Sequence, residues 1–338
     1  MSSFASSTTG VPARRAVSRP TSTTLERARR IISRYLEATP LIAAPELGER
    51  VSLKLESFQP TGSFKVRGAI AACSALTEGS RIVTASAGNH ALGIAWASAR
   101  LGVPATVVVA ETASAAKREA LAKLPIELIL HGEDYDAAEA YGLALARDPE
   151  RHATYVSPYN DPEVIAGQST LLDEIIARTD GNRPLTVVAG VGGGGLVAGI
   201  SMRARELSTA ARPIRVVGVE AEASRAVSAA VRAGDTHEVP IGETIADGLS
   251  GNLEPGSITV GMIAEYTDEL VAVTESDLYG AIRWLARNHG LVAEGAGAAA
   301  TAAVLGGKVD ASEGDIVLVI SGRNIALSRL AAILANPD

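Results

Sequence analysis

The sequence predicts an α/β fold with two parallel-type sheets, each covered by helices on both faces. Short apolar runs without polar alternation recur along the chain, for example at residues 105–109 and 316–320. A segment with helical periodicity follows each run, which is typical of parallel strands joined by covering helices. The chain has 338 residues, 47% of them hydrophobic and 20% charged, which suits one large or two modest globular domains.

Composition excludes several classes of function. The net charge of -7 and the lack of a basic stripe argue against a nucleic-acid-binding protein. The apolar runs are too short to cross a bilayer, so we expect no membrane segment. Cys73 is the single cysteine and cannot form an internal disulfide, so we expect it to be buried packing in a protein of a reducing compartment. A cytoplasmic location is therefore predicted.

The N-terminal region is predicted to be a tail followed by one helix. Residues 1–20 are rich in Ser, Thr, Ala, Pro and Arg without an apolar core, which indicates a disordered tail rather than a secretory signal, with a transit peptide as the alternative. A helical period covers residues 25–36, with Thr23 or Thr24 as its cap and Pro40 beyond its end.

The next segment is predicted to place a lysine at the start of a helix. The apolar run at residues 51–55 leads into turn residues 60–62, and Ser63 can cap a helix that begins near Phe64. Lys65 would then lie in the first turn, where the helix dipole disfavours a cation. Two readings stay open at this point: a solvated, screened lysine, or a lysine with a lowered pKa whose neutral amine attacks a carbonyl carbon.

The remaining elements alternate in order along the chain. Strands are expected at residues 81–84, 105–109, 127–130, 185–191, 215–219, 270–273 and 316–320. Helices are expected at residues 90–100, 115–123, 135–147, 161–177, 196–206 and 326–334. A further helix is expected after residue 273, opened by Thr274 with Asp277 as its capping-box partner.

Two segments have the form of anion-binding turns between a strand and a helix. The first is a run of four glycines before a helix, whose backbone N–H groups can point at a phosphate: Gly192, Gly193, Gly194 and Gly195. It lacks the Gly-Lys-Ser/Thr ending of a P-loop, and a flexible turn is the alternative. The second is Ser-Ala-Gly-Asn-His, which could be only a capping loop: Ser86, Ala87, Gly88, Asn89 and His90.

Four motifs in this order resemble the threonine dehydratase and serine racemase group of pyridoxal-phosphate enzymes. They are the Ser-Phe-Lys motif at residues 63–65, residues 85–90, the glycine run, and Ser-Gly-Arg-Asn at residues 321–324. The resemblance covers residues 22 to 335. It implies a two-domain, three-layer αβα fold of type II, similar to the tryptophan synthase β chain, with a large cofactor-binding domain at residues 21–80 and 161–338 and a small domain at residues 81–160. A homo-oligomer is also implied.

The resemblance also implies roles for individual residues. Lys65 would hold pyridoxal 5'-phosphate and move the α-proton, the glycine run would bind the phosphate, and Phe64 would pack near the ring. Asn89 would bond the phenolic oxygen and Ser321 would face the pyridine nitrogen. The substrate would contact residues 86–90, through Ser86 and the backbone for its carboxylate, with His90 more structural than catalytic, and Asn160 would line the mouth.

Three positions refine or test that resemblance. Racemases of the group carry a serine acid/base where this chain has Ala87, which predicts elimination instead of racemisation. Members of the group commonly carry a small residue where this chain has Arg323. The Ser-Gly-Arg-Asn form of the motif resembles that of dehydratases of hydroxyectoine breakdown. Arg323 could clamp a second substrate carboxylate, pair with Glu294 or face solvent. Glu220 resembles one ligand of a divalent-cation site, but Ala226 stands at the other position, so no metal is predicted and Glu220 is expected to be solvated or ion-paired.

The predicted function is a catabolic lyase acting on an amino-acid substrate. The chain would convert a β-hydroxy amino acid such as L-threonine or L-serine to a 2-oxo acid and ammonia. Hydroxyectoine-derived amino acids, 3-hydroxyaspartate and phenylserine are alternative substrates, because Arg323 departs from the pattern. Three rival functions stay open: a racemase of the same fold, a β-replacement enzyme of the same fold, and a non-catalytic binding protein that keeps the phosphate loop.

Overall fold

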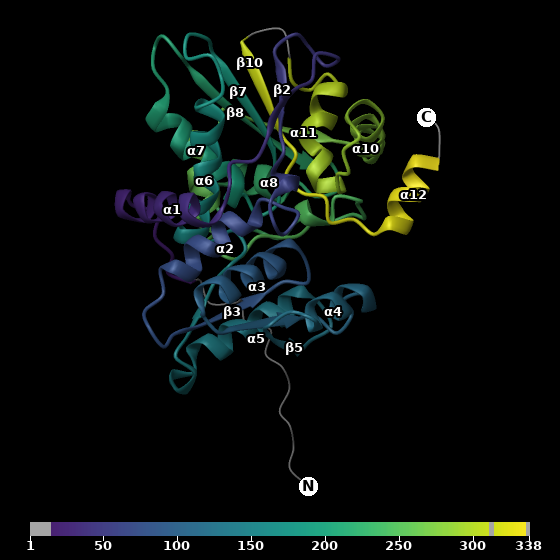
Figure 1. Cartoon of the computed structure of the whole chain (residues 1–338). Helices are drawn as coiled ribbons and strands as arrows, with labels where there is room; N and C mark the ends of the chain where they lie inside the picture. Colours follow the sequence, from purple (N-terminus) through teal and green to yellow (C-terminus); the bar gives the residue numbers. More distant parts are fainter. Residues whose placement is uncertain (1–14, 311–313, 336–338) are drawn as a thin grey trace.

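Two sheets organise the computed structural model, which describes residues 15–310 and 314–335 of the chain. The six-stranded sheet contains β1 (Leu41–Ala43), β2 (Val51–Lys54), β7 (Leu185–Gly190), β8 (Ile214–Ala221), β9 (Glu269–Val273) and β10 (Asp315–Val319). The four-stranded sheet contains β3 (Arg81–Ala85), β4 (Ala105–Val109), β5 (Glu127–Leu130) and β6 (Ala153–Tyr155). Figure 1 shows the four-stranded sheet below the larger one.

Both sheets are parallel except at one edge. The strand orders are β1-β2-β10-β7-β8-β9 and β5-β4-β3-β6. Within the larger sheet, Ile316 is opposite Val51 and Val187 is opposite Val216, both in parallel register. The exception is β1, which pairs with β2 in the antiparallel direction and was not predicted. The predicted parallel-type α/β fold is confirmed, with one antiparallel edge strand added.

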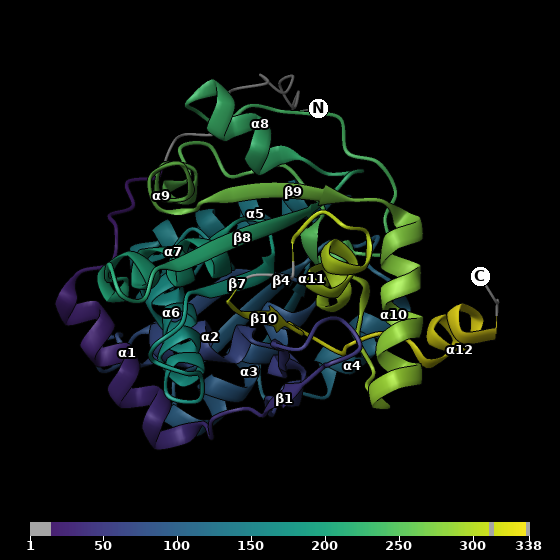
Figure 2. The same cartoon turned by 90° about the horizontal axis from the view of Figure 1, so that it is seen from above.

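Helices cover both faces of each sheet. The helices are α1 (Ser22–Tyr35), α2 (Lys65–Ser74), α3 (Asn89–Leu101), α4 (Ala115–Ala122), α5 (Tyr135–Arg147), α6 (Pro162–Ile176), α7 (Gly195–Leu207), α8 (Ala226–Ala233), α9 (Ile258–Tyr266), α10 (Glu275–His289), α11 (Gly295–Leu305) and α12 (Leu327–Ala335). One core of the larger sheet forms with α6 and α7, and the other forms with α10 and α11. In Figure 2, α12 lies outside α10. This is the expected three-layer arrangement.

Helix α2 lies between the two sheets and contacts helices that belong to each of them. It packs against α3, which covers the smaller sheet, and against α6, which covers the larger one (Figure 1). The predicted domain boundary near residue 160 falls in the loop between β6 and α6, where the chain leaves the smaller sheet. The first residue of α2 is Lys65. The lysine is therefore carried by the helix that connects the two halves.

A cluster of buried charged side chains holds α2 in place. The Arg67 guanidinium contacts the two carboxylate oxygens of Glu56 at 2.7 and 2.8 Å, and it contacts Glu174 at 2.7 Å. Lys54 donates to Glu174 and, at 2.8 Å, to the Thr39 carbonyl oxygen. Arg67, Glu56 and Lys54 are fully buried. Because every charge in this cluster has a partner, the desolvated groups are tolerated and hold α2 in one position.

Local corrections concern the helix caps. Helix α1 is capped by Thr21, whose hydroxyl accepts from the Thr24 N–H, so the predicted caps Thr23 and Thr24 are wrong by two or three residues. Ser63 does not cap α2. Its buried hydroxyl has no hydrogen-bond partner among the described residues, while the residue at the cap position is Phe64. The predicted capping box of α10 is confirmed, since Thr274 and Asp277 bond each other's backbone N–H.

The structure describes the last part of the predicted disordered tail, from residue 15 onward. Residues 1–14 lie outside the described residues, but Arg15 and Arg19 both form ion pairs, with Glu254 at 2.9 Å and with Glu265 at 2.6 Å. Disorder is therefore the wrong prediction for residues 15–20, because two arginines meet acidic partners on the body of the molecule.

Cys73 is buried as predicted, and burial raises the pKa of its thiol to about 12. No helix in the described part of the chain is long and apolar enough to span a bilayer.

Candidate active site

The side chain of Lys65 is the centre of the site. Its Nζ donates to the Pro158 carbonyl oxygen at 2.7 Å and lies 5.2 Å from the centroid of the Phe64 ring. Burial lowers the pKa of the lysine to about 8, although the nearby charge of Glu294 acts in the opposite direction. The structure therefore favours the reactive reading of Lys65 over the solvated one, because a useful fraction of the amine is neutral near neutral pH.

Backbone contacts hold the start of α2 against the end of β10. The Phe64 N–H donates to the Ser321 carbonyl oxygen at 3.0 Å, and Ser63 forms an antiparallel bridge with Gly322. Ser321 is buried directly after β10, and its hydroxyl lies 3.3 Å from the Ala296 carbonyl oxygen. Lys65 and Ser321 thus meet at the carboxyl edge of the larger sheet, where parallel sheets bind ligands.

The glycine run forms a tight cradle between β7 and α7. Gly194 has φ +86, which a side chain would disfavour, and a Cβ atom on Gly193 would lie 2.2 Å from the Cγ atom of Tyr159. Among the described residues, no acceptor takes the N–H groups of Gly192, Gly193 or Gly194. The first turn of α7, from Gly195, adds further free N–H groups. Open N–H groups at a helix start fit a phosphate.

Asn89 belongs to a chain of polar side chains beside Lys65. Its amide nitrogen donates to Glu294 Oε1 at 2.7 Å, and its amide oxygen accepts from the Asn324 amide at 2.6 Å. Glu294 is 6% exposed, and burial raises the pKa of its carboxyl to about 7, despite the hydrogen bond from Asn89. Sequence reasoning placed Glu294 only as a partner for Arg323. The site therefore holds an acid whose charge changes near neutral pH.

The predicted substrate loop lies at the start of α3 with a partly open backbone. The Ser86 hydroxyl accepts from the Gly88 N–H at 3.2 Å, and a Cβ atom on Gly88 would meet no other atom within 4 Å. Ala87 is half-buried. The His90 ring is buried with Nε2 3.4 Å from the Val156 carbonyl oxygen, and burial lowers its pKa to about 3. His90 is thus a neutral core residue, in agreement with the structural role expected for it.

Two predicted side chains are placed differently. Arg323 is exposed, with its guanidinium 5.7 Å from the centroid of the Phe58 ring. In the described part of the chain it makes no ion pair with Glu294, so that alternative is wrong: Glu294 is already bonded to Asn89. Glu220 is not solvated, and it forms no ion pair with any residue that the structure describes. It is 1% exposed and accepts from the Val227 and Ser228 N–H groups at the start of α8.

Asn160 also differs from its predicted place at the mouth of the site. Its side chain is fully buried, donates to Glu254 Oε2 at 2.9 Å and accepts from the Ile258 N–H at 3.0 Å. The amide is therefore used entirely inside the protein. It anchors the segment that includes Pro158 and Tyr159, and both of these residues border the site.

One ion pair crosses between the two halves of the molecule near the site. Lys117 on α4 contacts Asp247 in the loop before α9 at 2.9 Å, and both side chains are about half exposed. Asp247 is followed by Gly248, whose carbonyl oxygen would lie 2.7 Å from a Cβ atom on Gly192. The pair therefore lies close to the glycine cradle and joins the covering helix of the small sheet to the larger half.

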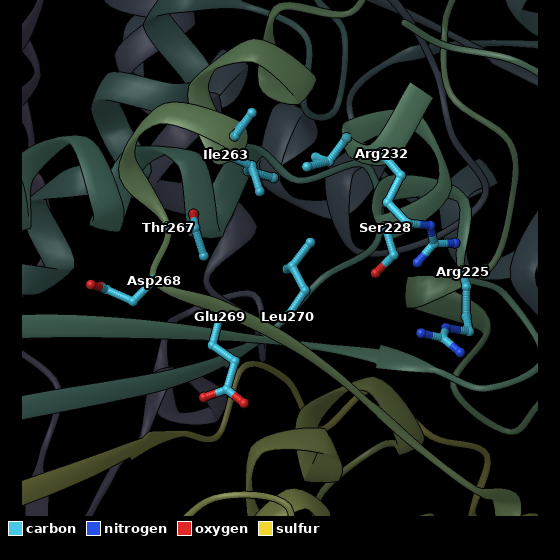
Figure 3. Close-up of a pocket in the computed structure, with 10 residues that line it drawn as sticks. Arg225, Ser228, Arg232, Ile263, Thr267, Asp268, Glu269 and Leu270 are labelled. Atoms are coloured by element: carbon cyan, nitrogen blue, oxygen red, sulfur yellow. The ribbon is translucent and has the colours of Figure 1, made fainter. Parts of the chain in front are cut away.

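A cavity of about 280 Å³ lies elsewhere, between α8, α9 and the start of β9. Figure 3 shows Arg225 and Ser228 at the start of α8, with Leu270 and Glu269 on the strand side. None of the predicted site residues lines this cavity. Within the described residues, no group of three or more His, Cys, Asp or Glu side chains could hold a metal ion.

The convergence of a low-pKa lysine with a glycine cradle is the arrangement that an aldehyde cofactor with a phosphate requires. Residues 32–322 match the family described as "Pyridoxal-phosphate dependent enzyme". The chain belongs to this family. Its cofactor is pyridoxal phosphate, and the residues present fit that group: Lys65 for the aldehyde and the glycine cradle for the phosphate. Phe64, Asn89 and Ser321 lie within the same set of contacts.

Curated relatives share most of their length with this chain. It is 38% identical over 317 residues to an L-threonine ammonia-lyase of Thermotoga maritima, covering 92% of this chain and 77% of that protein. It is 35% identical over 321 residues to the catabolic L-threonine dehydratase TdcB of Staphylococcus aureus, covering 92% and 90%. Among solved structures, maize serine racemase superposes with a TM-score of 0.83 at 26% identity, covering 93% of this chain and 97% of that one.

Several residues that shape the site were missed from the sequence. Tyr159 packs on Gly193 and Gly195, and Pro158 supplies the carbonyl oxygen that accepts from Lys65. Glu294 and Asn324 complete the contacts of Asn89. No short motif marks Pro158 or Glu294, since each acts through a partner at least 93 residues away in the sequence. Only Asn324 carried a signal, because it ends the Ser-Gly-Arg-Asn motif.

Proposed function

We propose that this enzyme is a dehydratase that converts a β-hydroxy amino acid, such as L-threonine or L-serine, to a 2-oxo acid and ammonia. The observation that carries the proposal is Lys65, whose amine has a pKa of about 8 and which begins α2 where that helix is bonded to the end of β10. Its amine contacts Pro158, and the next residue, Tyr159, packs on the glycine cradle. Named ammonia-lyase and dehydratase relatives at 38% and 35% identity support it.

Each residue of the site has a defined task in this proposal. When bound, pyridoxal phosphate supplies an electron sink for the bond-breaking step. Lys65 Nζ holds the cofactor and, once displaced by the substrate amine, takes the α-proton. The free N–H groups of the glycine cradle bind the phosphate, and those at the start of α3 near Ser86 bind the substrate carboxylate. Asn89, oriented by Glu294 and Asn324, would bond the phenolic oxygen of the cofactor.

Ala87 supports elimination over racemisation. Racemisation needs a second group that delivers a proton to the face opposite the lysine, and a methyl side chain has no proton to give. The half-buried Ala87 stands between β3 and α3, and its neighbour Ser86 uses its hydroxyl on the Gly88 N–H. The similarity to maize serine racemase therefore supports the fold and leaves the reaction to the side chains.

Arg323 does not support a second carboxylate on the substrate. Its guanidinium lies over the exposed ring of Phe58, and its backbone N–H bonds the Gly62 carbonyl oxygen at 2.9 Å. We therefore propose small neutral β-hydroxy amino acids as substrates, ahead of 3-hydroxyaspartate. Phenylserine and a hydroxyectoine-derived amino acid stay in the assay as the alternatives that the sequence suggested.

The test is release of 2-oxo acid by the cofactor-loaded enzyme across this panel. We expect release from L-threonine or L-serine, and loss of at least about a thousandfold in Lys65→Ala, because one residue both holds the cofactor and moves the proton. Lys123→Ala, an exposed lysine at the end of α4, is the matched control and should retain full activity. No release from any amino acid by enzyme with the visible absorbance of bound cofactor would refute the proposal. Inversion of the α-carbon or consumption of an added thiol would then identify a racemase or a β-replacement enzyme.

We also propose a cytoplasmic homo-oligomer with two domains, one built around each sheet. The single buried cysteine supports a reducing compartment. The separate helix layers of the two sheets support the domain division. Size-exclusion chromatography with light scattering measures the oligomeric state directly, and a monomer at micromolar concentration would contradict this part of the proposal.

A further inference from the structure

Three consecutive residues after β6 make three different contacts, two of them with the site. The Pro158 carbonyl oxygen accepts from Lys65 Nζ at 2.7 Å. The Tyr159 ring packs against Gly193 of the glycine cradle, and the Tyr159 backbone and Cβ atom lie against Gly195. The Asn160 carbonyl oxygen accepts from the Arg15 guanidinium. The position of this short segment therefore fixes both the amine and the wall of the phosphate cradle.

The segment is anchored by one buried carboxylate, that of Glu254. Glu254 is 6% exposed and accepts from Asn160 Nδ2 at 2.9 Å, while its own N–H donates to the Tyr159 hydroxyl at 2.6 Å. Its cationic partner is Arg15, at 2.9 Å from Nε to Oε1 and 3.3 Å from the second nitrogen to Oε2. Without that partner, Glu254 would be a buried charge compensated only by neutral donors.

Arg15 also touches the smaller half of the molecule. Its guanidinium lies 5.5 Å from the centroid of the Tyr155 ring, at the end of β6, and its side chain is only 20% exposed. A residue ahead of the first helix therefore contacts β6, the loop that contains Asn160 and the loop that contains Glu254. A planar guanidinium suits this position because it bonds a carboxylate and a carbonyl oxygen at once and stacks on an aromatic ring.

We propose that Arg15 is a positioning residue for the cofactor site. By joining Glu254 to the Asn160 carbonyl oxygen, it holds residues 158–160 in place, so that Tyr159 supports the glycine cradle and Pro158 keeps Lys65 Nζ aimed into the site. Its loss lowers the affinity of the apoprotein for pyridoxal phosphate. The inference depends on the cofactor of the family and not on which amino acid the enzyme converts.

Arg19 provides a matched control in the same stretch of chain. It also pairs with a carboxylate, Glu265 at 2.6 Å, and also lies over a tyrosine ring, that of Tyr266 at 5.6 Å. Its side chain is 43% exposed, and neither partner contacts the glycine cradle or Lys65. Arg15→Gln and Arg19→Gln therefore remove the same chemistry. Arg19 is linked to the glycine cradle only through the body of α9, whose Thr259 donates to the Gly193 carbonyl oxygen at 2.8 Å, whereas Arg15 bonds residues 158–160 directly.

The experiment measures the dissociation constant of pyridoxal phosphate from the full-length apoprotein by absorbance and fluorescence titration, without any substrate. We expect Arg15→Gln to raise the dissociation constant about tenfold. This is the effect expected for the loss of one charged hydrogen bond that acts on the cofactor site through residues 158–160. Arg19→Gln should stay within about twofold. Arg15→Lys, which keeps the charge and loses the planar fork, should lie between wild type and Arg15→Gln.

A second variant keeps the inference testable if Arg15→Gln destabilises the whole chain. Glu254→Gln retains the shape and the neutral bonds to Asn160 but removes the partner of Arg15. If the two residues act as one unit, the double variant binds cofactor no more weakly than the worse single variant. Additive losses would overturn the inference. A lowered melting temperature of the apoprotein with unchanged cofactor affinity would overturn it as well.

Discussion

The rate at which the apoprotein attaches its cofactor should follow the ionisation of Lys65, because only the neutral amine is a nucleophile. The pKa of about 8 for Lys65 is lower than the model-compound value of 10.5. That difference corresponds to a net free energy of about 3 kcal/mol that disfavours the charged form, with burial as its largest cause and the charge of Glu294 opposing it. At pH 7, about one Lys65 in ten is neutral, against roughly one in three thousand for an unperturbed lysine, a ratio of about 300.

The sign of the pH dependence follows directly. Raising the pH removes the proton from Nζ, so the rate of attachment rises about tenfold from pH 6 to pH 7 and levels off above about pH 8. Stopped-flow absorbance in the visible range, with apoprotein mixed into excess pyridoxal phosphate, measures this rate. A free amine such as Nα-acetyl-lysine, followed under the same conditions, corrects for ionisation of the cofactor itself.

Glu294→Gln tests the cause of the remaining basicity. The charge of Glu294 raises the pKa of Lys65, so removing it should shift the midpoint to lower pH. A corrected profile that continues to rise tenfold per unit up to pH 10 would refute the argument, because it would mean that Lys65 is solvated like a free lysine.

Two further substitutions test the surroundings of the site. Arg67→Met leaves the buried Glu56 with Lys54 as its nearest cation at 4.0 Å, and urea unfolding of the apoprotein should show a loss of about 3–5 kcal/mol. The matched control is Arg30→Met, at an exposed residue, which should change the free energy of unfolding by less than about 0.5 kcal/mol. A loss as small as this in Arg67→Met would contradict the role of the cluster. Gly193→Ala places a Cβ atom 2.2 Å from Tyr159 Cγ and should weaken cofactor binding about tenfold or more by titration. Gly280→Ala on α10, which meets no atom within 4 Å, should leave binding unchanged, and equal affinities of the two variants would argue against the cradle.

The sequence predicted the elements whose pattern is local. The apolar runs at residues 105–109 and 127–130 coincide with β4 and β5, and Thr274 with Asp277 forms the capping box of α10. Helix α11 was missed because its residues are small and apolar throughout, and those from Gly295 to Ala303 are buried on every face. A helix without a polar face has no amphipathic period to detect. The cap of α1 was misplaced because several serines and threonines compete for that position. The cap of α2 was misplaced because the helix begins one residue later than predicted and its cap position is Phe64, which has no side-chain acceptor.

The residues of the candidate site likewise divide into those with a local sequence pattern and those without one. Lys65, the glycine run and Ser321 follow directly from strands or begin helices, so their placement at one sheet edge could be predicted. Contacts of Asn89 with Glu294, and of Tyr159 with Gly193, join distant segments and depend on how the two sheets are oriented. No pattern within either segment encodes them. Arg323 is the opposite case, because it lies inside a recognised motif but does not take the predicted role. Its side chain is exposed and lies over the Phe58 ring.

Two of the contacts between the halves of the molecule differ greatly in strength. Around α2, fully buried charges and the packing of α3 and α6 make a stiff joint that resists displacement. Close to the glycine cradle, Lys117 and Asp247 form an exposed ion pair. Breaking this pair costs no more than about 1 kcal/mol. A third contact, from Asn89 on α3 to Glu294 and Asn324 of the larger half, joins the two halves beside Lys65. Because Lys65 begins α2, its amine is carried by the stiff joint and keeps its place if the exposed pair breaks.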